Sequence, residues 1–130
     1  MTNSKQKGAR MERLLAKIFR EWGYESRRTA QYCGNTGDAA DVTLDYIHVE
    51  AKHQEQFRII DWMSQAVRDA KKSGKLPAVF FKKNYGDIYV TMRLEDWHKM
   101  YDSYYSDMWF KDKMNPPEES NESERMDKTT

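Results

Sequence analysis

Three residues in the middle of the chain are of types that together can hydrolyse a phosphodiester bond. Asp41 is followed later in the chain by Glu50, and Lys52 lies just beyond it. Two neighbouring carboxylates repel each other and favour a divalent cation between them, and oxygen ligands select Mg²⁺ or Mn²⁺ over zinc. Such a cation polarises the scissile phosphate and activates water, while an ammonium group stabilises the developing charge. The backbone carbonyl of Ala51 is a further candidate ligand.

The elements that must position these residues are two short strands, over 40–45 and 46–52, joined by a tight turn. Because strand side chains alternate between faces, Glu50 and Lys52 share the face opposite to the apolar residues of their strand. If the two strands pair through the turn, Asp41 comes to lie near both of them. The sequence therefore predicts that one Asp, one Glu and one Lys converge on one surface.

The same spacing has a simpler interpretation, which the residues alone leave open. An Asp…Glu-x-Lys pattern is common by chance, and an exposed sheet face carries such charges as ordinary cross-strand ion pairs. His48 is on the same face of the strand, where a histidine exposed on the surface is expected.

The remaining hydrophobic pattern predicts an α/β chain. The other predicted elements are a helix over 4–22, a strand over 24–31, a loop over 32–38, a helix over 57–73, strands over 78–83 and 87–93, and a helix over 94–109. The order α-β-β-β-α-β-β-α is typical of a central sheet flanked by helices. In the last helix the spacing of Tyr101 and Tyr104 favours core positions, and a stacking or dimer surface is the alternative.

Length and composition indicate one domain without a membrane segment. The chain has 130 residues, of which 38% are hydrophobic and 33% charged, and no run approaches the ~20 apolar residues of a membrane span. The first residues lack an apolar secretory segment and the single Cys33 excludes an internal disulfide, so a cytoplasmic protein is expected. We expect one domain over 1–110 and a polar, acidic, disordered tail over 111–130.

The net charge of +1 is an average over unequal parts of the chain. Residues 1–28 contain eight basic and three acidic residues, whereas residues 111–130 contain four basic and six acidic ones. A basic leading segment indicates an anionic partner such as nucleic acid, although a solvated helix face would have the same composition.

Several sequence blocks resemble known nucleases. Asp41…Glu50-Ala51-Lys52 resembles the PD-(D/E)xK signature of restriction-endonuclease-like enzymes, with Ala40 in place of the proline. The segment 5–14, Lys-Gln-Lys-Gly-Ala-Arg-Met-Glu-Arg-Leu, is similar to the opening of archaeal-type Holliday junction resolvases. The resemblance covers about residues 5–93, and Ala51 stands where that family usually has a cysteine.

The resemblance implies a restriction-endonuclease-like central mixed β-sheet and a Mg²⁺-dependent site in which Mn²⁺ substitutes. It implies that Asp41 and Glu50 are the principal metal ligands and that Glu12 on the first helix completes the metal site. Lys52 matches the catalytic lysine, and Gln65 on the second helix matches a residue that supports the metal site in some related nucleases. The residues implied to contact DNA are Lys5, Lys7, Arg10, Arg27, Arg28 and Thr29.

The function implied by the resemblance is a structure-specific endodeoxyribonuclease that resolves four-way DNA junctions by paired, symmetrical strand incision. A homodimer with two active sites would match the near-twofold symmetry of a junction. A bacteriophage source is expected from the compact format. Two alternatives stay open: a nuclease of the same superfamily acting on other branched or linear DNA, and a non-catalytic DNA-binding module on a nuclease fold.

Overall fold

The computed structural model describes residues 4–29 and 40–115 of the chain. Helix α1 (Ser4–Glu21) buries Met11, Leu15 and Phe19, which recur every four residues and so form one apolar stripe along the helix. The helix ends before Gly23, whose φ of 98° is a backbone conformation that favours glycine.

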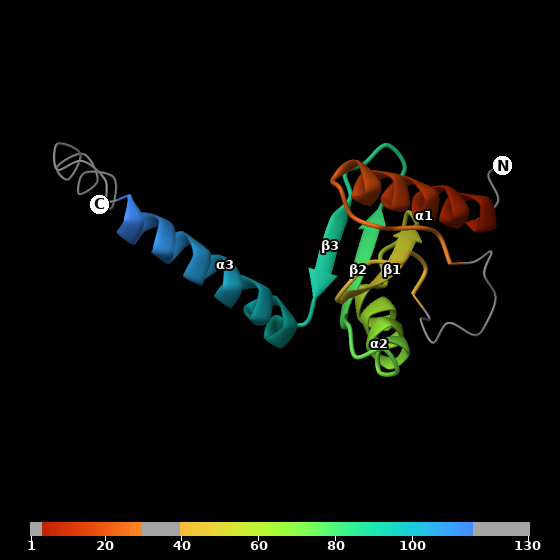
Figure 1. Ribbon diagram of the computed structural model, residues 1–130. Coiled ribbons are helices and arrows are strands. Elements are labelled where there is room, and N and C mark those ends of the chain that lie inside the picture. Colours follow the sequence, from red (N-terminus) through yellow and green to blue (C-terminus); the bar gives the residue numbers. More distant parts are fainter. Residues whose placement is uncertain (1–3, 30–39, 116–130) are drawn as a thin grey trace, which may run out of the picture. The chain divides into compact units, whose positions relative to one another are not determined.

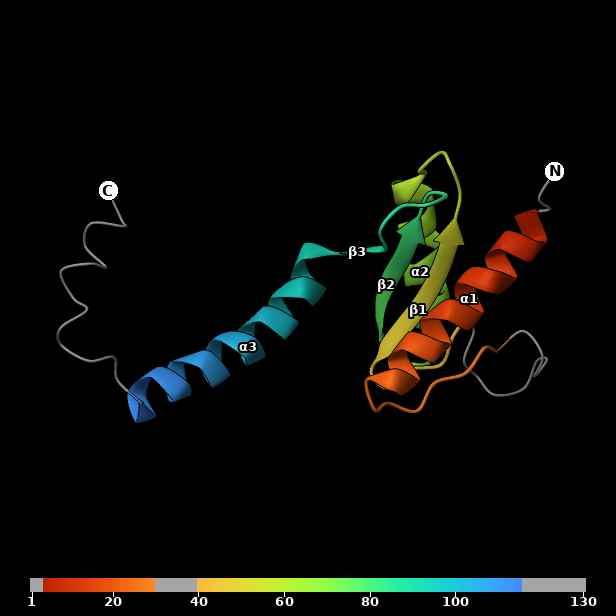
Figure 2. The same cartoon turned by 90° about the horizontal axis from the view of Figure 1, so that it is seen from above.

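Three strands form a mixed sheet in the order β1-β2-β3 (Figures 1 and 2). Strands β1 (Ile47–His53) and β2 (Leu76–Lys82) are parallel, and helix α2 (Ile59–Ala70) connects them. Strand β3 (Tyr89–Met92) pairs antiparallel with β2. The α/β class and the mixed sheet flanked by helices are confirmed, as are the helices and strands predicted from residue 46 onward, with bounds shifted by a few residues.

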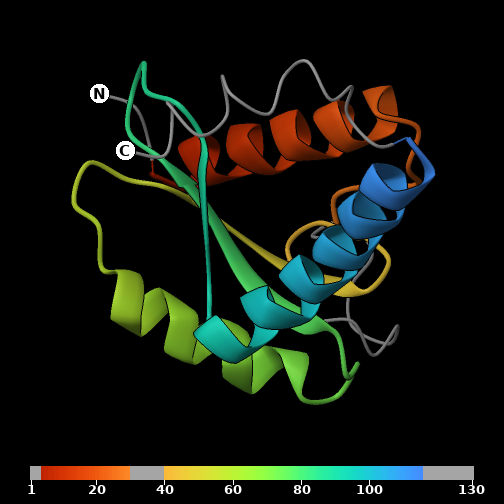
Figure 3. The same cartoon turned by 90° about the vertical axis from the view of Figure 1, so that its left-hand side faces the viewer.

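Helices α1 and α2 lie on opposite sides of this sheet (Figure 3). On one side, Val49 and Ala51 of β1 pack in a cluster with the buried stripe of α1. On the other side, Trp62 and Ala66 of α2 pack with Val79 and Phe81 of β2. Because β1 is parallel to β2 with Glu50 beside Val79, the polar face of β1 also points toward the α2 side. Both faces of β1 are therefore covered.

The strands predicted over 24–31 and 40–45 are not formed as regular strands in the described residues. Only isolated antiparallel bridges are present, from Arg28 to Val42 and from Val42 to Val49. A side chain takes the place of a backbone hydrogen bond between the two segments, since Ser26 Oγ donates to the carbonyl of Thr43 at 2.7 Å. The predicted pairing of Asp41 with β1 is confirmed, because its N–H donates to the carbonyl of Val49 at 2.9 Å.

The turn between this segment and β1 is also where it was predicted. Tyr46 has a φ of 71°, a left-handed conformation that is unusual for a residue other than glycine and reverses the chain before β1. The predicted loop over 32–38, with Cys33, lies outside the described residues, as do residues 116–130 of the predicted tail. The tail was predicted to begin at residue 111, but residues 111–114 are helical.

Contacts divide the chain into two compact units, which meet in sequence between Asp96 and Trp97. Helix α3 (Leu94–Met114) contains the first residues of the second unit and continues beyond the predicted helix end at residue 109. Every side chain from Trp97 to Met114 is exposed, so the core positions predicted for Tyr101 and Tyr104 are wrong. No helix in the described ranges has the length and apolarity of a membrane span.

Candidate active site

Asp41 is held beside β1 by its own carboxylate. The segment that carries it is bound to β1 through the N–H of Asp41 and through the bridge between Val42 and Val49. Its Oδ2 atom accepts a hydrogen bond from the N–H of Ala51 at 2.9 Å. A half-buried carboxylate is thus fixed next to the Glu50-Ala51-Lys52 block, as the sequence predicted.

Glu50 lies in the interior rather than on an open sheet face. Its side chain is 2% exposed, and its Oε1 atom is 2.9 Å from Nε2 of His48, which is 0% exposed. The prediction of a surface histidine is wrong because α2 covers this face of β1. Within the part of the chain that the structure describes, His48 Nδ1 has no hydrogen-bond partner.

Helix α2 adds Asp69, a residue that the sequence analysis missed. One potential ligand atom from each of His48, Glu50 and Asp69 lies within 4.8 Å of the other two. Asp69 follows Gln65 by one helical turn, so the two residues share a face of α2. That spacing is the signal that could have found Asp69 once Gln65 was assigned to the site.

Lys52 and Gln65 lie close together, a contact that the sequence did not predict. Lys52 Nζ lies 3.4 Å from Gln65 Oε1, to which it donates a long hydrogen bond. Both residues are half-buried. The ammonium group therefore extends from β1 toward α2, on the face that also carries Glu50.

Glu12 reaches the site from α1 but has a cationic partner. Its Oε2 atom is 2.6 Å from Nε of Arg28, and both side chains are largely covered. The pair joins α1 to the segment that bridges to Val42. Glu12 thus lies near Asp41 while its charge is balanced by Arg28.

The electrostatics of the site are dominated by its carboxylates. Burial, and after it the negative charges of Glu50 and Glu12, raise the pKa of Asp41 to about 7, against the opposing effects of the Ala51 N–H and Lys52. An elevated pKa means that the surroundings disfavour another negative charge. Even with Lys52 present, negative charge predominates around Asp41, and a bound cation would stabilise such a site.

The donor set fits a divalent cation. Asp41, Glu50 and Glu12 offer carboxylate oxygens, the ligands that Mg²⁺ and Mn²⁺ prefer. The group formed by His48, Glu50 and Asp69 adds an imidazole nitrogen, which suits transition metals. Glu50 belongs to both groups of potential ligands.

The residues predicted to contact DNA have different surroundings. Lys5, Arg10 and Arg27 are exposed, Lys7 is half-buried, and Arg28 is engaged by Glu12. The hydroxyl of Thr29 is within hydrogen-bonding distance of two carbonyl oxygens, those of Ala40 and Asp41. Its described contacts therefore fix the backbone that carries Asp41.

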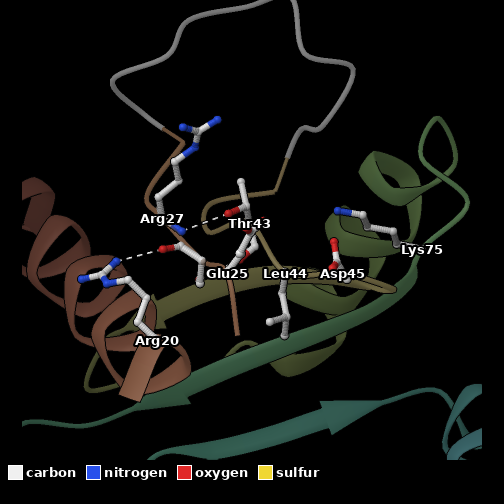
Figure 4. A pocket seen from close by; sticks show the side chains of 8 residues that line it. Arg20, Glu25, Arg27, Thr43, Leu44, Asp45 and Lys75 are labelled. Atoms are coloured by element: carbon white, nitrogen blue, oxygen red, sulfur yellow. Dashed lines mark hydrogen bonds between the residues drawn. The ribbon is translucent and has the colours of Figure 1, made fainter. Parts of the chain in front are cut away.

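A polar hollow of about 520 Å³ lies along the segment that carries Asp41. Figure 4 shows Arg20, Arg27 and Lys75 around it, together with the acidic Glu25 and Asp45. Arg20 is held by a bond from Nη1 to the carbonyl of Ser26 at 2.9 Å. The lining contains none of Asp41, Glu50 or Lys52, so the hollow adjoins the carboxylate site without including it.

Comparison with known proteins agrees with this geometry. The sequence matches a family described as "Phage putative PDDEXK endonuclease" over residues 3–128. No curated protein matches the sequence at a significant level. The match spans nearly the whole chain and includes every residue of the candidate site. The chain belongs to this family of phage PDDEXK endonucleases.

Proposed function

We propose that this nuclease is a divalent-metal-dependent endodeoxyribonuclease that cuts four-way DNA junctions by paired, symmetrical incision, acting as a homodimer. The observation that carries the proposal is that Asp41 lies beside Glu50 and Lys52. The latter two are on β1, and Asp41 is on the segment that bridges to β1. The raised pKa of Asp41 supports a cation as the missing positive charge.

Asp41 and Glu50 would hold the cation, with Glu12 and the carbonyl of Ala51 as further ligands, and Mg²⁺ is the expected ion with Mn²⁺ as a substitute. When bound, it supplies Lewis acidity toward phosphate and a water molecule of lowered pKa. The chain itself supplies the positioning of these groups. The Ala51 N–H orients the carboxylate of Asp41, and His48 does the same for Glu50.

Lys52 is the residue proposed to act on the substrate. Its Nζ atom is directed by Gln65, so the ammonium group is aimed at a defined place beside the carboxylates. There it can stabilise the negative charge that develops on the phosphate oxygens. The contact with Gln65 is long, which leaves the ammonium group able to exchange this partner for a phosphate.

The proposal of a junction substrate is supported by the N-terminal resemblance and by the distribution of basic residues. Exposed cations on α1 and around the polar hollow, namely Arg10, Arg20 and Arg27, are suited to phosphate contacts. Such contacts read the path of the backbone, which differs between a junction and a linear duplex. The expected location is the cytoplasm of the phage host.

The test is a cleavage assay with matched substrates. A strand-labelled four-way junction, a flap and a linear duplex are incubated with the full chain in Mg²⁺, in Mn²⁺ and in EDTA. We expect paired cuts at symmetry-related positions in the junction, slower cutting of the other substrates, and none in EDTA. Asp41→Asn and Glu50→Gln should abolish cleavage, whereas Asp61→Asn, an exposed carboxylate of α2, should not.

Each alternative has its own outcome in this assay. Faster cutting of flap or linear DNA would overturn the junction assignment but keep the nuclease. Cleavage that survives both active-site substitutions would remove the proposed site. Metal-independent junction binding that falls steeply with salt, without any cleavage by the parent protein, would indicate the DNA-binding module instead.

A further inference from the structure

The polar face of β1 carries a second group of potential metal ligands beside the proposed catalytic site. His48 and Glu50 are two residues apart on this face, and α2 runs back along the sheet so that Asp69, in its last turn, approaches them. One potential ligand atom from each of the three lies within 4.8 Å of the other two. Within residues 4–29 and 40–115, no other three residues among His, Cys, Asp and Glu lie so close together.

The surroundings of Asp69 are unfavourable for a carboxylate without a cation. It is half-buried beside Glu50, which is 2% exposed, and it lies at the C-terminal end of α2, where the helix dipole disfavours negative charge. In the part of the chain that the structure describes, its carboxylate forms no ion pair. The nearest cation along β1, Lys52, is hydrogen-bonded to Gln65 one turn earlier in α2.

Neither tautomer of a neutral His48 satisfies both ring nitrogens. Nε2 is 2.9 Å from Glu50 Oε1, and Nδ1 has no hydrogen-bond partner among the described residues. With the proton on Nε2, the ring donates to Glu50, and the lone pair of Nδ1 is buried without a donor. With the proton on Nδ1, that N–H is buried without an acceptor, and lone pairs of Nε2 and Glu50 face each other. The second arrangement is that of two ligands of one cation, since neighbouring ligands at about 2.1 Å from a metal lie roughly 3 Å apart.

We propose that His48, Glu50 and Asp69 form a binding site for a divalent transition-metal ion such as Mn²⁺, Co²⁺ or Zn²⁺. The imidazole nitrogen favours these ions over Mg²⁺, which prefers an all-oxygen set such as that of Asp41, Glu50 and Glu12. Because Asp69 is only half-buried, its side chain can turn to complete the coordination. The ion would join α2 to β1 and balance the two carboxylates. This site goes beyond the proposed function and shares only Glu50 with the proposed catalytic site.

A hydrogen bond between His48 and Glu50 in the protein interior is the simpler account of this group. It explains the 2.9 Å distance if Nε2 carries the proton. It explains neither the unpartnered Nδ1 atom nor the position of Asp69 at a helix C-terminus beside a buried carboxylate. A plain hydrogen bond also gives the group no affinity for a metal ion, so metal binding separates the two accounts.

The experiment titrates the full chain with Co²⁺ in the absence of DNA, followed by the visible absorption of bound cobalt and by calorimetry. Every protein in the series carries Asp41→Asn, which removes a ligand of the proposed catalytic site but none of this one. We expect one equivalent of Co²⁺ to bind, and an excess of Mg²⁺ should not displace it. Adding Asp69→Asn or His48→Gln should weaken Co²⁺ binding by at least about tenfold, since the loss of even an outer partner of a metal site costs about 10–100-fold.

The matched control is Asp61→Asn, which changes an exposed carboxylate of the same helix and should leave Co²⁺ binding unchanged. Circular dichroism checks that each variant is folded. Because His48 is fully buried, Asp69→Asn decides the test if His48→Gln does not fold. Co²⁺ should also raise the free energy of unfolding of the Asp41→Asn protein, and adding Asp69→Asn should reduce this stabilisation.

Three results would overturn the proposed site. The first is an Asp41→Asn protein that binds no Co²⁺. The second is binding that Asp69→Asn leaves unchanged, which would place the ion elsewhere in the chain. The third is displacement of Co²⁺ by Mg²⁺, which would contradict a ligand set with an imidazole nitrogen. Because binding is measured without DNA and without Asp41, a failed metal site and a failed nuclease assignment give different results.

Discussion

The two faces of β1 are both buried, but one is apolar and the other is polar. Val49 and Ala51 point toward α1 and belong to the apolar core. Glu50 and His48, on the alternate face, are just as buried yet polar, and they meet Asp69 of α2. One face therefore lowers the free energy of the folded state by excluding water, whereas the other buries charge that a folded protein ordinarily avoids.

On the polar side of β1, the carboxylates differ in how far a neighbouring cation balances their charge. Glu12 is balanced by Arg28 at 2.6 Å, but Asp41 has a pKa raised to about 7 by burial and by its acidic neighbours. Substitutions on the two faces should consequently separate activity from stability.

Glu50→Gln should lower the cleavage rate by at least about 10³-fold, because it removes a proposed metal ligand. The free energy of unfolding should not fall, since the amide keeps an acceptor for His48 and removes a charge beside Asp41. Single-turnover cleavage and urea unfolding measure the two quantities. A rate within tenfold of the parent would place catalysis elsewhere.

Lys52→Met should lower the cleavage rate by about 10²–10³-fold, the usual cost of losing one transition-state donor. Metal affinity, measured by calorimetry, should be retained, because the ammonium group is not a ligand. Lys82→Met, a half-buried lysine on β2, is the control. A large loss of metal affinity without loss of maximal rate would contradict the assigned role.

The pH dependence of stability should carry the signature of Asp41. Because its folded pKa is raised from 3.8 to about 7, the folded state binds the proton more tightly. The resulting stabilisation, on the order of 2–4 kcal/mol, is fully present below pH 4 and is lost as the pH rises to about 7. Urea unfolding in EDTA across this range should show it in the parent protein, and Asp41→Asn should lack it.

The same measurement with Mg²⁺ tests the cation directly. At pH 8, where Asp41 is charged, Mg²⁺ should stabilise the parent protein but not Asp41→Asn, since a ligand that binds only the folded state raises its stability. Identical pH profiles for the parent and the variant in EDTA would show that Asp41 is not the titrating group.

Val49→Ala should act on the apolar face alone. It should lower the free energy of unfolding by about 2 kcal/mol, because it leaves a small cavity in the core beside α1. The cleavage rate per folded molecule should stay within about twofold of the parent. A selective loss of activity with unchanged stability would show that the two faces are not independent.

Arg28→Gln should have the smallest effect, a loss of about 1 kcal/mol in the free energy of unfolding. It leaves Glu12 without its cation, and added Mg²⁺ should recover part of the loss. Arg27→Gln, on the exposed neighbouring residue, is the matched control. Equal effects of the two substitutions would indicate that the pair with Glu12 adds nothing specific.

Much of the fold could be predicted from local patterns. The stripe of Met11, Leu15 and Phe19 predicts α1, and the alternation along Ile47–His53 predicts a strand with a polar face. The strands predicted over 24–31 and 40–45 failed as regular elements because the side chains of Ser26 and Thr43 take backbone partners that a ladder would use. Propensity along the chain does not include such contacts between distant residues.

Some residues of the candidate site could be predicted from the sequence, and others could not. Asp41, Glu50 and Lys52 could be assigned because their spacing and alternation place them together whatever surrounds the sheet. The burial of His48 and the approach of Asp69 could not be assigned, since both depend on how α2 returns across β1. The exposure of Tyr101 and Tyr104 differed from the prediction because helical spacing identifies a shared face but not what covers it.

The sequence by itself determined which groups the protein can use: two carboxylates and a lysine at strand spacing, a basic first helix, and an apolar stripe on the last. Periodicity and charge are local properties, so they can be read without a fold. Only the tertiary structure decided that Glu50 is buried against His48, that Glu12 is paired with Arg28, and that burial raises the pKa of Asp41 to about 7. These properties depend on solvent exclusion and on distances between residues far apart in the chain, and packing alone sets both.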